Sequence, residues 1–224
     1  MQIQTVQTGW TLVSSGVPDR DSHRWRKAYT GLFQRRSKRM KVPVKCFYVC
    51  VGEHHFLIDA GWSLEVISHP VTHLDCDHVS GLKDFEKVPV YVSEEELAFS
   101  RKKRLRYGNI AKGYEFRFLH FVDDKDAPFG QSADVFGDGS VTAYLTPTHS
   151  AGSIIYRISD GGRFALVVGD NGYKDDSWVK GILPGPLFSE DNMRQCLSWI
   201  KEQSADDRCL GVLCAHNPKD TFVM

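Results

Sequence analysis

The segment Thr-His-Leu-Asp-Cys-Asp-His at residues 72–78 places four candidate metal ligands, His73, Asp75, Asp77 and His78, within six residues. His73 and Asp75 are two residues apart, so on an extended segment their side chains point to the same side. Asp77 and His78 are adjacent, and a turn there would direct them towards a second position. Two pairs of ligands suit two metal ions close together, which is the arrangement used for metal-assisted hydrolysis.

The residues that follow, Val79-Ser80-Gly81-Leu82, are typical of the start of a helix. The segment would then lie where a strand ends, turns and continues as a helix. Loops of this kind often contain acidic residues and histidines without binding a metal. The segment alone therefore leaves two interpretations, a two-metal site or an ordinary polar turn.

The composition is that of a globular protein, since 42% of the 224 residues are hydrophobic and 25% are charged. We expect a single domain over residues 1–224, with variable loops at about 15–42 and 100–130. The formal net charge of +0 argues against a general nucleic-acid binder. No window approaches the roughly 18 apolar residues of a membrane span, so we expect no membrane contact.

The first residues, Met1–Val6, lack the basic region and apolar run of a signal peptide. The six cysteines show no Cys-x-x-Cys spacing. Without an export signal, reduced thiols and a cytoplasmic location are expected. The sequence does not distinguish a monomer from a homodimer.

Apolar patterning predicts a mixture of strands and helices. Ser93 and Ser189 are predicted to cap two helices, the first with Glu96 at the capping-box position and the second running to residue 203. Hairpins come first and helices follow strands later, so the fold class is α+β or mixed α/β, built as a sandwich. The predicted strands cover residues 1–14, 42–51, 55–58, 88–92, 116–122, 141–145, 154–158, 164–168 and 210–214.

The stretch Arg24–Lys41 contains eight Lys or Arg residues and no acid. Such a run is usually a solvated face or a mobile loop. The alternative is a loop over the active site that attracts an anionic small-molecule substrate. Both interpretations stay open at the level of the sequence.

Three later residues, His149, Asp170 and His216, each follow the end of an apolar strand. Residues at strand ends are often caps or surface groups, so each of the three is weak evidence by itself. Together they complete a ligand set, because separate strand ends can converge at one edge of a sandwich. Hydrolytic sites built from histidines and carboxylates generally leave positions open for water and substrate.

At this point the sequence resembles the metallo-β-lactamase-fold hydrolases, whose signature is His-x-His-x-Asp-His followed by a single His, an Asp and a last His. The resemblance implies an αββα sandwich with a dinuclear metal site on one sheet edge. Residues 58–61 also resemble the Asp-x-Gly turn that lies below the site in that family. The signature maps onto His73, Asp75, Asp77, His78, His149, Asp170 and His216.

Within that family, residues 89–97, 135–141 and 145–149 are most similar to N-acyl-homoserine lactonases. Tyr173 lies where those lactonases have a tyrosine that contacts the substrate; the alternative is a half-buried loop aromatic. The resemblance implies hydrolysis of a lactone or another ester by a hydroxide held between two divalent ions. Tyr173 would then stabilise the oxyanion, and Asp77 would pass a proton to the leaving oxygen.

The resemblance also implies how the ligands divide between the ions. One ion would be held by His73, Asp75 and His149, and the other by Asp77, His78 and His216. Asp170 would bridge the two.

Asp75 departs from the family, which has a second histidine at this position. Three aspartates and one hydroxide balance two divalent ions, so the cluster would be neutral, whereas a histidine would leave it at +1. Zinc is the expected metal, with iron or manganese as alternatives because oxygen ligands suit them. Two further departures are Thr148 in place of a glycine and Ser153 in place of a histidine.

The carboxylate at this position is also similar to flavodiiron proteins, which reduce oxygen or nitric oxide at a diiron site. This chain has no flavodoxin domain to supply electrons, so hydrolysis is preferred. A non-catalytic member of the fold that binds a ligand is the third interpretation.

Overall fold

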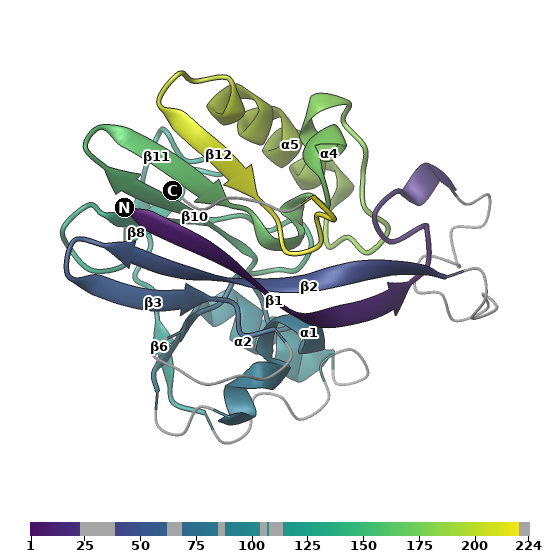
Figure 1. Cartoon of the computed structure of the whole chain (residues 1–224), viewed down its shortest axis with the longest axis horizontal. Coiled ribbons are helices and arrows are strands. Elements are labelled where there is room, and N and C mark those ends of the chain that lie inside the picture. Colours follow the sequence, from purple (N-terminus) through teal and green to yellow (C-terminus); the bar gives the residue numbers. More distant parts are fainter. Residues whose placement is uncertain (23–38, 62–68, 85–87, 104–106, 108–113, 220–224) are drawn as a thin grey trace.

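Two β-sheets face each other in the middle of the molecule, and helices cover the outer face of each (Figure 1). The computed structural model describes residues 1–22, 39–61, 69–84, 88–103, 107 and 114–219. The predicted αββα sandwich is confirmed. Whether residues 1–224 form a single folding unit stays a prediction, and most of the basic stretch Arg24–Lys41 lies outside the described residues.

The first sheet has the order β1-β2-β3 and contains β1 (Gln2–Val13), β2 (Met40–Val51) and β3 (His54–Ile58), all antiparallel. A short parallel sheet lies beside β3 and contains β4 (His69–Pro70), β5 (Val90–Val92) and β6 (Phe116–Phe118). Helices α1 (Cys76–Val79) and α2 (Glu94–Lys102) cover this side of the sandwich (Figure 1).

The second sheet has the order β12-β11-β10-β9-β8-β7. Neighbouring strands are antiparallel except β11 and β12, which are parallel. Helices α4 (Asp175–Val179) and α5 (Glu190–Ser204) pack on its outer face (Figure 1). Its strands are β7 (Val122–Asp123), β8 (Gln131–Asp134), β9 (Val141–Leu145), β10 (Ile154–Asp160), β11 (Arg163–Val167) and β12 (Cys209–Leu213).

Strand β10 shows why the second sheet lies at the centre. Ile154 and Tyr156 point into the core between the two sheets, where Phe47 and Phe56 of the first sheet also lie. Ile155 points the other way and packs in the cluster beneath α5. A strand covered on both faces is apolar on both faces, which explains why this run does not alternate.

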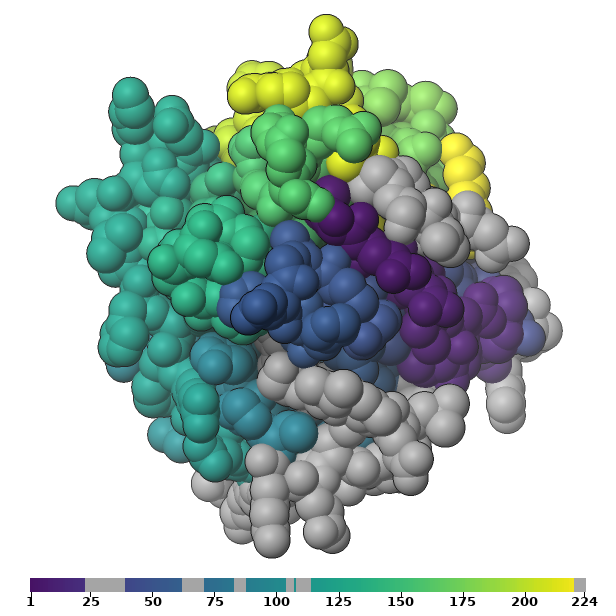
Figure 2. Space-filling model, turned by 60° about the vertical axis from the view of Figure 1, so that its left-hand side comes forward, coloured from purple at the N-terminus to yellow at the C-terminus, as the bar shows by residue number. Residues whose placement is uncertain are grey.

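The end of the sandwich away from the ligand-bearing strand ends is joined by polar contacts between the sheets. The amino group of Met1 pairs with the carboxylate of Asp160, and His54 Nε2 lies 2.8 Å from Asp138 Oδ2. Figure 2 shows this arrangement, with the purple β1 and the blue β2–β3 hairpin next to the green turns of the second sheet. The hairpin turns of the two sheets therefore lie side by side.

Several predicted boundaries are wrong. The run 116–122 is split between β6 in the short parallel sheet and β7 in the large sheet, since the chain crosses between sheets within it. The helix expected at Val79 begins at Cys76, so Asp77 and His78 lie in its first turn. Strand β2 begins at Met40, two residues before its predicted start and inside the expected loop 15–42.

The capping predictions are confirmed for both serines. The Oγ of Ser93 accepts a hydrogen bond from Glu96 N at 3.1 Å, and the Oγ of Ser189 accepts one from Asn192 N at 3.3 Å. The Glu96 carboxylate does not complete the capping box, because it accepts hydrogen bonds from the main-chain amides of Leu74 and Gly152 instead. Among the described helices, none is long and apolar enough to cross a membrane.

Candidate metal centre

The structure brings all seven predicted ligands together at one edge of the sandwich. They come from the loop before α1, from α1 itself, and from the ends of β9, β11 and β12. Three overlapping groups of them have ligand atoms within 4.8 Å of one another. These groups are His73, His78 and Asp170; His73, Asp75 and His149; and Asp77, His78 and His216.

The first predicted ligand set is centred on Asp75. Its Oδ2 lies 3.0 Å from His149 Nε2 and 3.4 Å from His73 Nε2. Asp75 occupies the N-cap position of α1, yet its side chain makes no capping hydrogen bond. An aspartate at this position normally accepts from the first turn of the helix. The Asp75 carboxylate instead faces two histidines from distant parts of the sequence.

The second predicted set lies beside the first. His216 Nε2 is 3.4 Å from Asp77 Oδ2, and the ring centroids of His78 and His216 are 5.4 Å apart. Asp170 lies between the sets: its Oδ1 is 3.3 Å from both His78 Nε2 and His216 Nε2, and its Oδ2 is 3.7 Å from His149 Nε2. A carboxylate placed in this way has one oxygen for each set.

The Nδ1 atom of every histidine in the cluster has a hydrogen-bond partner on the side away from the centre. This arrangement fixes each ring and leaves Nε2 as the atom that faces the carboxylates. The partners are Thr72 Oγ1 for His73 (3.0 Å), Asp59 Oδ2 for His78 (2.8 Å), the Pro186 carbonyl for His149 (3.1 Å) and the Pro43 carbonyl for His216 (2.7 Å).

Asp59 connects several of these groups below the site. It is fully buried, has a positive φ of 61°, and accepts hydrogen bonds from Thr72 N (2.8 Å) and Thr72 Oγ1 (3.0 Å). The same carboxylate orients His78. The left-handed backbone is uncommon outside glycine, and an aspartate tolerates it better than most residues. Asp59 therefore supports both ends of the segment 72–78.

The ligand atoms themselves fit a cation. Among the described residues, His73 Nε2, His78 Nε2 and Asp170 Oδ1 are buried polar atoms without a hydrogen-bond partner. His73 Nε2 lies 3.4 Å from Asp75 Oδ2 and His78 Nε2 lies 3.3 Å from Asp170 Oδ1, but neither contact is a hydrogen bond. Buried polar atoms nearly always form hydrogen bonds, so three that face one centre without any need an explanation. Imidazole nitrogens and a carboxylate oxygen are ligands that divalent metals accept.

The electrostatics of the metal-free cluster agree with this interpretation. Burial lowers the pKa of His78, but the carboxylates of Asp59, Asp170 and Asp77 outweigh burial and hold it well above its ordinary value. The pKa of His216 is raised in the same way against burial, chiefly by Asp170. Protons on these histidines thus balance the negative charge of the carboxylates, and a bound metal cation would replace those protons.

The sequence pattern of the Metallo-beta-lactamase superfamily matches residues 71–211, which is more than half of the chain. The chain belongs to the metallo-beta-lactamase superfamily. Among curated proteins, N-acyl homoserine lactonase AttM of Rhizobium radiobacter is 32% identical over 156 residues, which cover 66% of this chain and 56% of that protein. The probable metallo-hydrolase Rv2300c of Mycobacterium tuberculosis is 26% identical over 183 residues, covering 70% and 57%. The chain thus spans little more than half the length of these relatives.

Solved structures have the same fold over nearly the whole chain. An N-acyl homoserine lactone hydrolase with N-hexanoyl-L-homoserine at its catalytic metal center superposes with a TM-score of 0.74 at 14% identity, covering 97% of this chain and 93% of that one. The dizinc quorum-quenching lactonase AidC gives a TM-score of 0.70 at 13% identity, covering 96% and 87%. At these identities the likeness establishes the fold alone.

Tyr173 lies against this superfamily site rather than in an open loop. It is 4% exposed, and its ring stacks on His216 with centroids 5.3 Å apart. Its hydroxyl donates a hydrogen bond to Asp170 Oδ2 at 2.6 Å. Burial, together with the charge of Asp170, holds the pKa of Tyr173 well above its ordinary value, so the hydroxyl keeps its proton.

A cleft of about 310 Å³ opens beside Tyr173 and His216. Apolar side chains line part of it, and Lys41 and Lys174 are also among its lining residues. The remaining lining residues are Ser15, Pro18, Asp19, Ser22, Met40, Val42 and Pro218.

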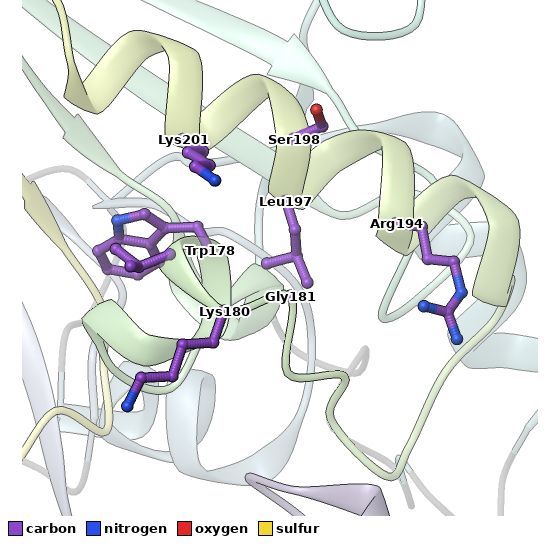
Figure 3. Close-up of a pocket in the computed structure, with 8 residues that line it drawn as sticks. Trp178, Lys180, Gly181, Arg194, Leu197, Ser198 and Lys201 are labelled. Carbon is purple, nitrogen blue, oxygen red and sulfur yellow. The ribbon is translucent and has the colours of Figure 1, made fainter.

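A second hollow of about 350 Å³ lies between α4 and α5, with Trp178, Lys180, Leu197 and Lys201 in its lining (Figure 3). None of the predicted ligands lines it. Trp178 nevertheless supports the site from behind, because a Cβ added at Gly172 would meet its ring at 3.1 Å. Gly172 therefore gives the ring room beneath the chain between Asp170 and Tyr173.

Two contributors to the site escaped the sequence analysis. Asn171 donates from Nδ2 to Val168 O (3.0 Å) and Thr146 Oγ1 (3.3 Å), and its Oδ1 accepts from the Thr148 hydroxyl. It thereby joins the loop before His149 to the one that carries Asp170. Glu96 was identified only as a capping residue. The position of Asn171 directly after Asp170 could have indicated that it belongs to the site. Nothing in the sequence indicates that the Glu96 side chain points inward.

Proposed function

We propose that this chain is a hydrolase that holds two divalent metal ions and hydrolyses a lactone or another carboxylic ester. The observation that supports this best is the convergence of seven histidine and aspartate side chains, three of whose buried ligand atoms form no hydrogen bond. The names of the curated relatives, lactonases and metallo-hydrolases, agree with it. The chain spans only part of those relatives, so its proposed activity is based on the geometry of this site and not on their names.

In this proposal His73, Asp75 and His149 hold one ion, Asp77, His78 and His216 hold the other, and Asp170 lies between them. Ions bound there supply Lewis acidity and lower the pKa of water, which is the chemistry that ester hydrolysis needs. The Nδ1 partners Asp59, Pro43 and Pro186 keep the imidazoles in the required orientation.

Two residues of the chain act on the substrate directly. Tyr173 keeps its proton and donates a hydrogen bond to Asp170 Oδ2 in the metal-free protein, so a turn of the hydroxyl away from Asp170 would let it donate to the carbonyl oxygen as negative charge develops there. The side chain of Asp77 is 20% exposed, against 6% for Asp170. Asp77 can therefore reach both the centre and the leaving oxygen. As a carboxylate it takes the proton that the attacking water or hydroxide gives up as the acid product forms, and it passes that proton to the leaving oxygen.

The cleft beside Tyr173 is where we place the rest of the substrate. Its apolar lining suits an acyl chain, and Lys41 and Lys174 suit a negative charge on the substrate. The KM of an anionic ester should then rise with ionic strength, because salt screens exposed charges. A KM that does not change with salt would argue against the anionic class.

Asp75 influences which metal the site prefers. With three aspartates, two ions and one hydroxide the cluster is neutral, so harder metals compete better than they would at a site with an additional histidine. Zinc remains the metal we propose, with manganese or iron as alternatives. Iron in quantity would favour the redox function that a carboxylate at this position also suits.

The test combines metal analysis with a substrate panel. Elemental analysis and a visible spectrum of the purified protein distinguish colourless zinc from a coloured iron site. Lactones, thioesters and phosphodiesters are then tried with the loaded protein and with Asp170→Asn. The proposal expects lactone or ester turnover that falls at least about 100-fold, together with metal content, in the variant. Asp176→Asn, which changes a half-exposed aspartate of α4 that pairs with Lys180 and none of the predicted ligands, is the matched control. Turnover by Asp170→Asn at normal metal content would refute it.

A further inference from the structure

Glu96 is a fully buried carboxylate near the metal centre that contacts no metal ligand side chain. It lies in the first turn of α2, where neighbouring Glu94 and Glu95 are exposed. A buried carboxylate is costly unless it is hydrogen-bonded, so its partners indicate what it does. Its Oε1 accepts from Leu74 N at 3.0 Å, and its Oε2 accepts from Gly152 N at 3.2 Å.

These two amides belong to the two segments that carry the first predicted ligand set. Leu74 lies between His73 and Asp75, and Gly152 lies three residues after His149. One carboxylate thus holds both segments at a set separation. The distance between the two segments matters because an aspartate side chain is shorter than a histidine side chain. Asp75 on one segment must reach His149 Nε2 on the other.

Gly152 is also enclosed by the start of α2. Its carbonyl accepts a hydrogen bond from Ser93 Oγ at 2.8 Å, and a Cβ at this position would come within 2.7 Å of Glu96 Cα. The start of α2 therefore holds the loop after His149 through both the N–H and the C=O of Gly152. One further link joins the two segments directly, from Ile154 N to Thr72 O at 2.9 Å.

The second ligand set is held by other groups. His78 is oriented by Asp59 and His216 by the carbonyl of Pro43. Neither of the hydrogen bonds that Glu96 accepts comes from these residues or their neighbours in sequence.

We propose that Glu96 is a positioning residue for one of the two metal positions, the one formed by His73, Asp75 and His149. The inference rests on the proposed metal centre and adds that the two positions can be weakened separately. In Glu96→Gln the amide group keeps one acceptor but turns a donor towards the other N–H, so one of the two tethers is lost.

The experiment is a metal titration of chelator-treated protein, with zinc bound per chain measured by equilibrium dialysis and elemental analysis. Wild-type protein should take up two ions. In Glu96→Gln one binding event should weaken by about 10- to 100-fold, the range found when outer partners of metal ligands are changed, while the other stays within twofold. Glu95→Gln makes the same change of charge one residue away on the exposed face and should match the wild type.

Two backgrounds identify which position is affected. In His149→Ala, where the first set is already broken, adding Glu96→Gln should change the remaining affinity little. In His216→Ala, where only the first set remains, the same change should weaken the remaining binding by about 10- to 100-fold. Equal weakening of both ions, or loss in the His149→Ala background, would overturn the inference.

A gentler variant covers the case in which Glu96→Gln does not fold. Ser93→Ala removes the hydrogen bond to Gly152 O and a helix cap, and it should weaken the same ion. Ser189→Ala removes the equivalent cap of α5 and should lower the melting temperature without changing metal binding. Equal metal binding in both serine variants would count against the inference. These metal-binding measurements need no substrate. If Glu96→Gln selectively loses one ion while the wild type hydrolyses none of the substrates tried, the inference stands and the proposed activity is refuted.

Discussion

Asp75 Oδ2 lies 3.0 Å from His149 Nε2, although the two residues are 74 positions apart in the sequence. The contact joins the loop before α1 to the loop after β9. It explains why an aspartate at an N-cap position makes no capping bond, because its carboxylate faces this histidine instead.

Asp75→His should shift the metal preference of the protein towards zinc. The substitution replaces a hard oxygen ligand with an imidazole and raises the charge of the loaded cluster by one, so manganese and iron lose more than zinc does. Competition dialysis against equal zinc and manganese, followed by elemental analysis, measures the ratio. An unchanged ratio would mean that Asp75 is not a ligand.

Tyr173→Phe should lower kcat by about 100-fold or more and leave metal content unchanged, because an oxyanion donor is lost while every proposed ligand remains. The metal-free variant should also lose about 1.5–3 kcal/mol of unfolding free energy, since the hydroxyl donates to the Asp170 carboxylate. Steady-state kinetics and chemical denaturation after chelation test the two parts. Metal loss in proportion to activity would instead make Tyr173 a support for Asp170.

Zinc binding should release protons at neutral pH. Nearby carboxylates outweigh burial and raise the pKa of His78 and His216 in the metal-free protein, so both rings keep their protons to a higher pH than a free histidine does. A metal needs the unprotonated ring, and apparent affinity should therefore rise with pH until these raised pKa values are passed. Calorimetry in two buffers of different ionisation enthalpy measures the release. His216→Ala should release fewer protons, and a heat independent of buffer would contradict the prediction.

Gly169→Ala should destabilise the protein by clearly more than Gly161→Ala. Both glycines have a positive φ, 54° and 56°, so each alanine carries a left-handed backbone cost of about 1–2 kcal/mol. Only at Gly169 does the added Cβ meet a neighbour, Thr72 Oγ1 at 2.7 Å, whereas at Gly161 nothing lies within 4 Å. Thermal unfolding of the two variants compares them directly. Gly169→Ala should also bind less metal, because Thr72 contacts Asp59 and His73 and because Gly169 directly precedes Asp170. Equal stability of the two variants would rule out this clash.

Short-range patterns in the sequence were sufficient for much of the fold. The serine caps at Ser93 and Ser189 depend on neighbours three residues away, so their chemistry is visible in a few letters. The runs that form β10 and β11 are apolar on both faces, which marks them as buried. The run 116–122 failed because its division between two sheets depends on partners elsewhere, not on its own residues.

The candidate site divides in the same way. The order and spacing of His73, Asp75, Asp77 and His78, with three later strand ends, were enough to name every side chain of the cluster. The sequence by itself thus determined which chemical groups are available and in which order the chain presents them. Those properties are local, since they depend on residue type and on the period of a strand or helix.

Only the tertiary structure decided how these groups face one another. It turned the Asp75 carboxylate from its helix towards His149, placed the Tyr173 hydroxyl on Asp170, and directed Glu96 to Leu74 and Gly152 instead of its own helix start. Each of these contacts joins groups that approach only after the two sheets and their helices have packed. A carboxylate has several partners within reach of its sequence position, and the packed chain selects among them by burial and by which donors are left unpaired.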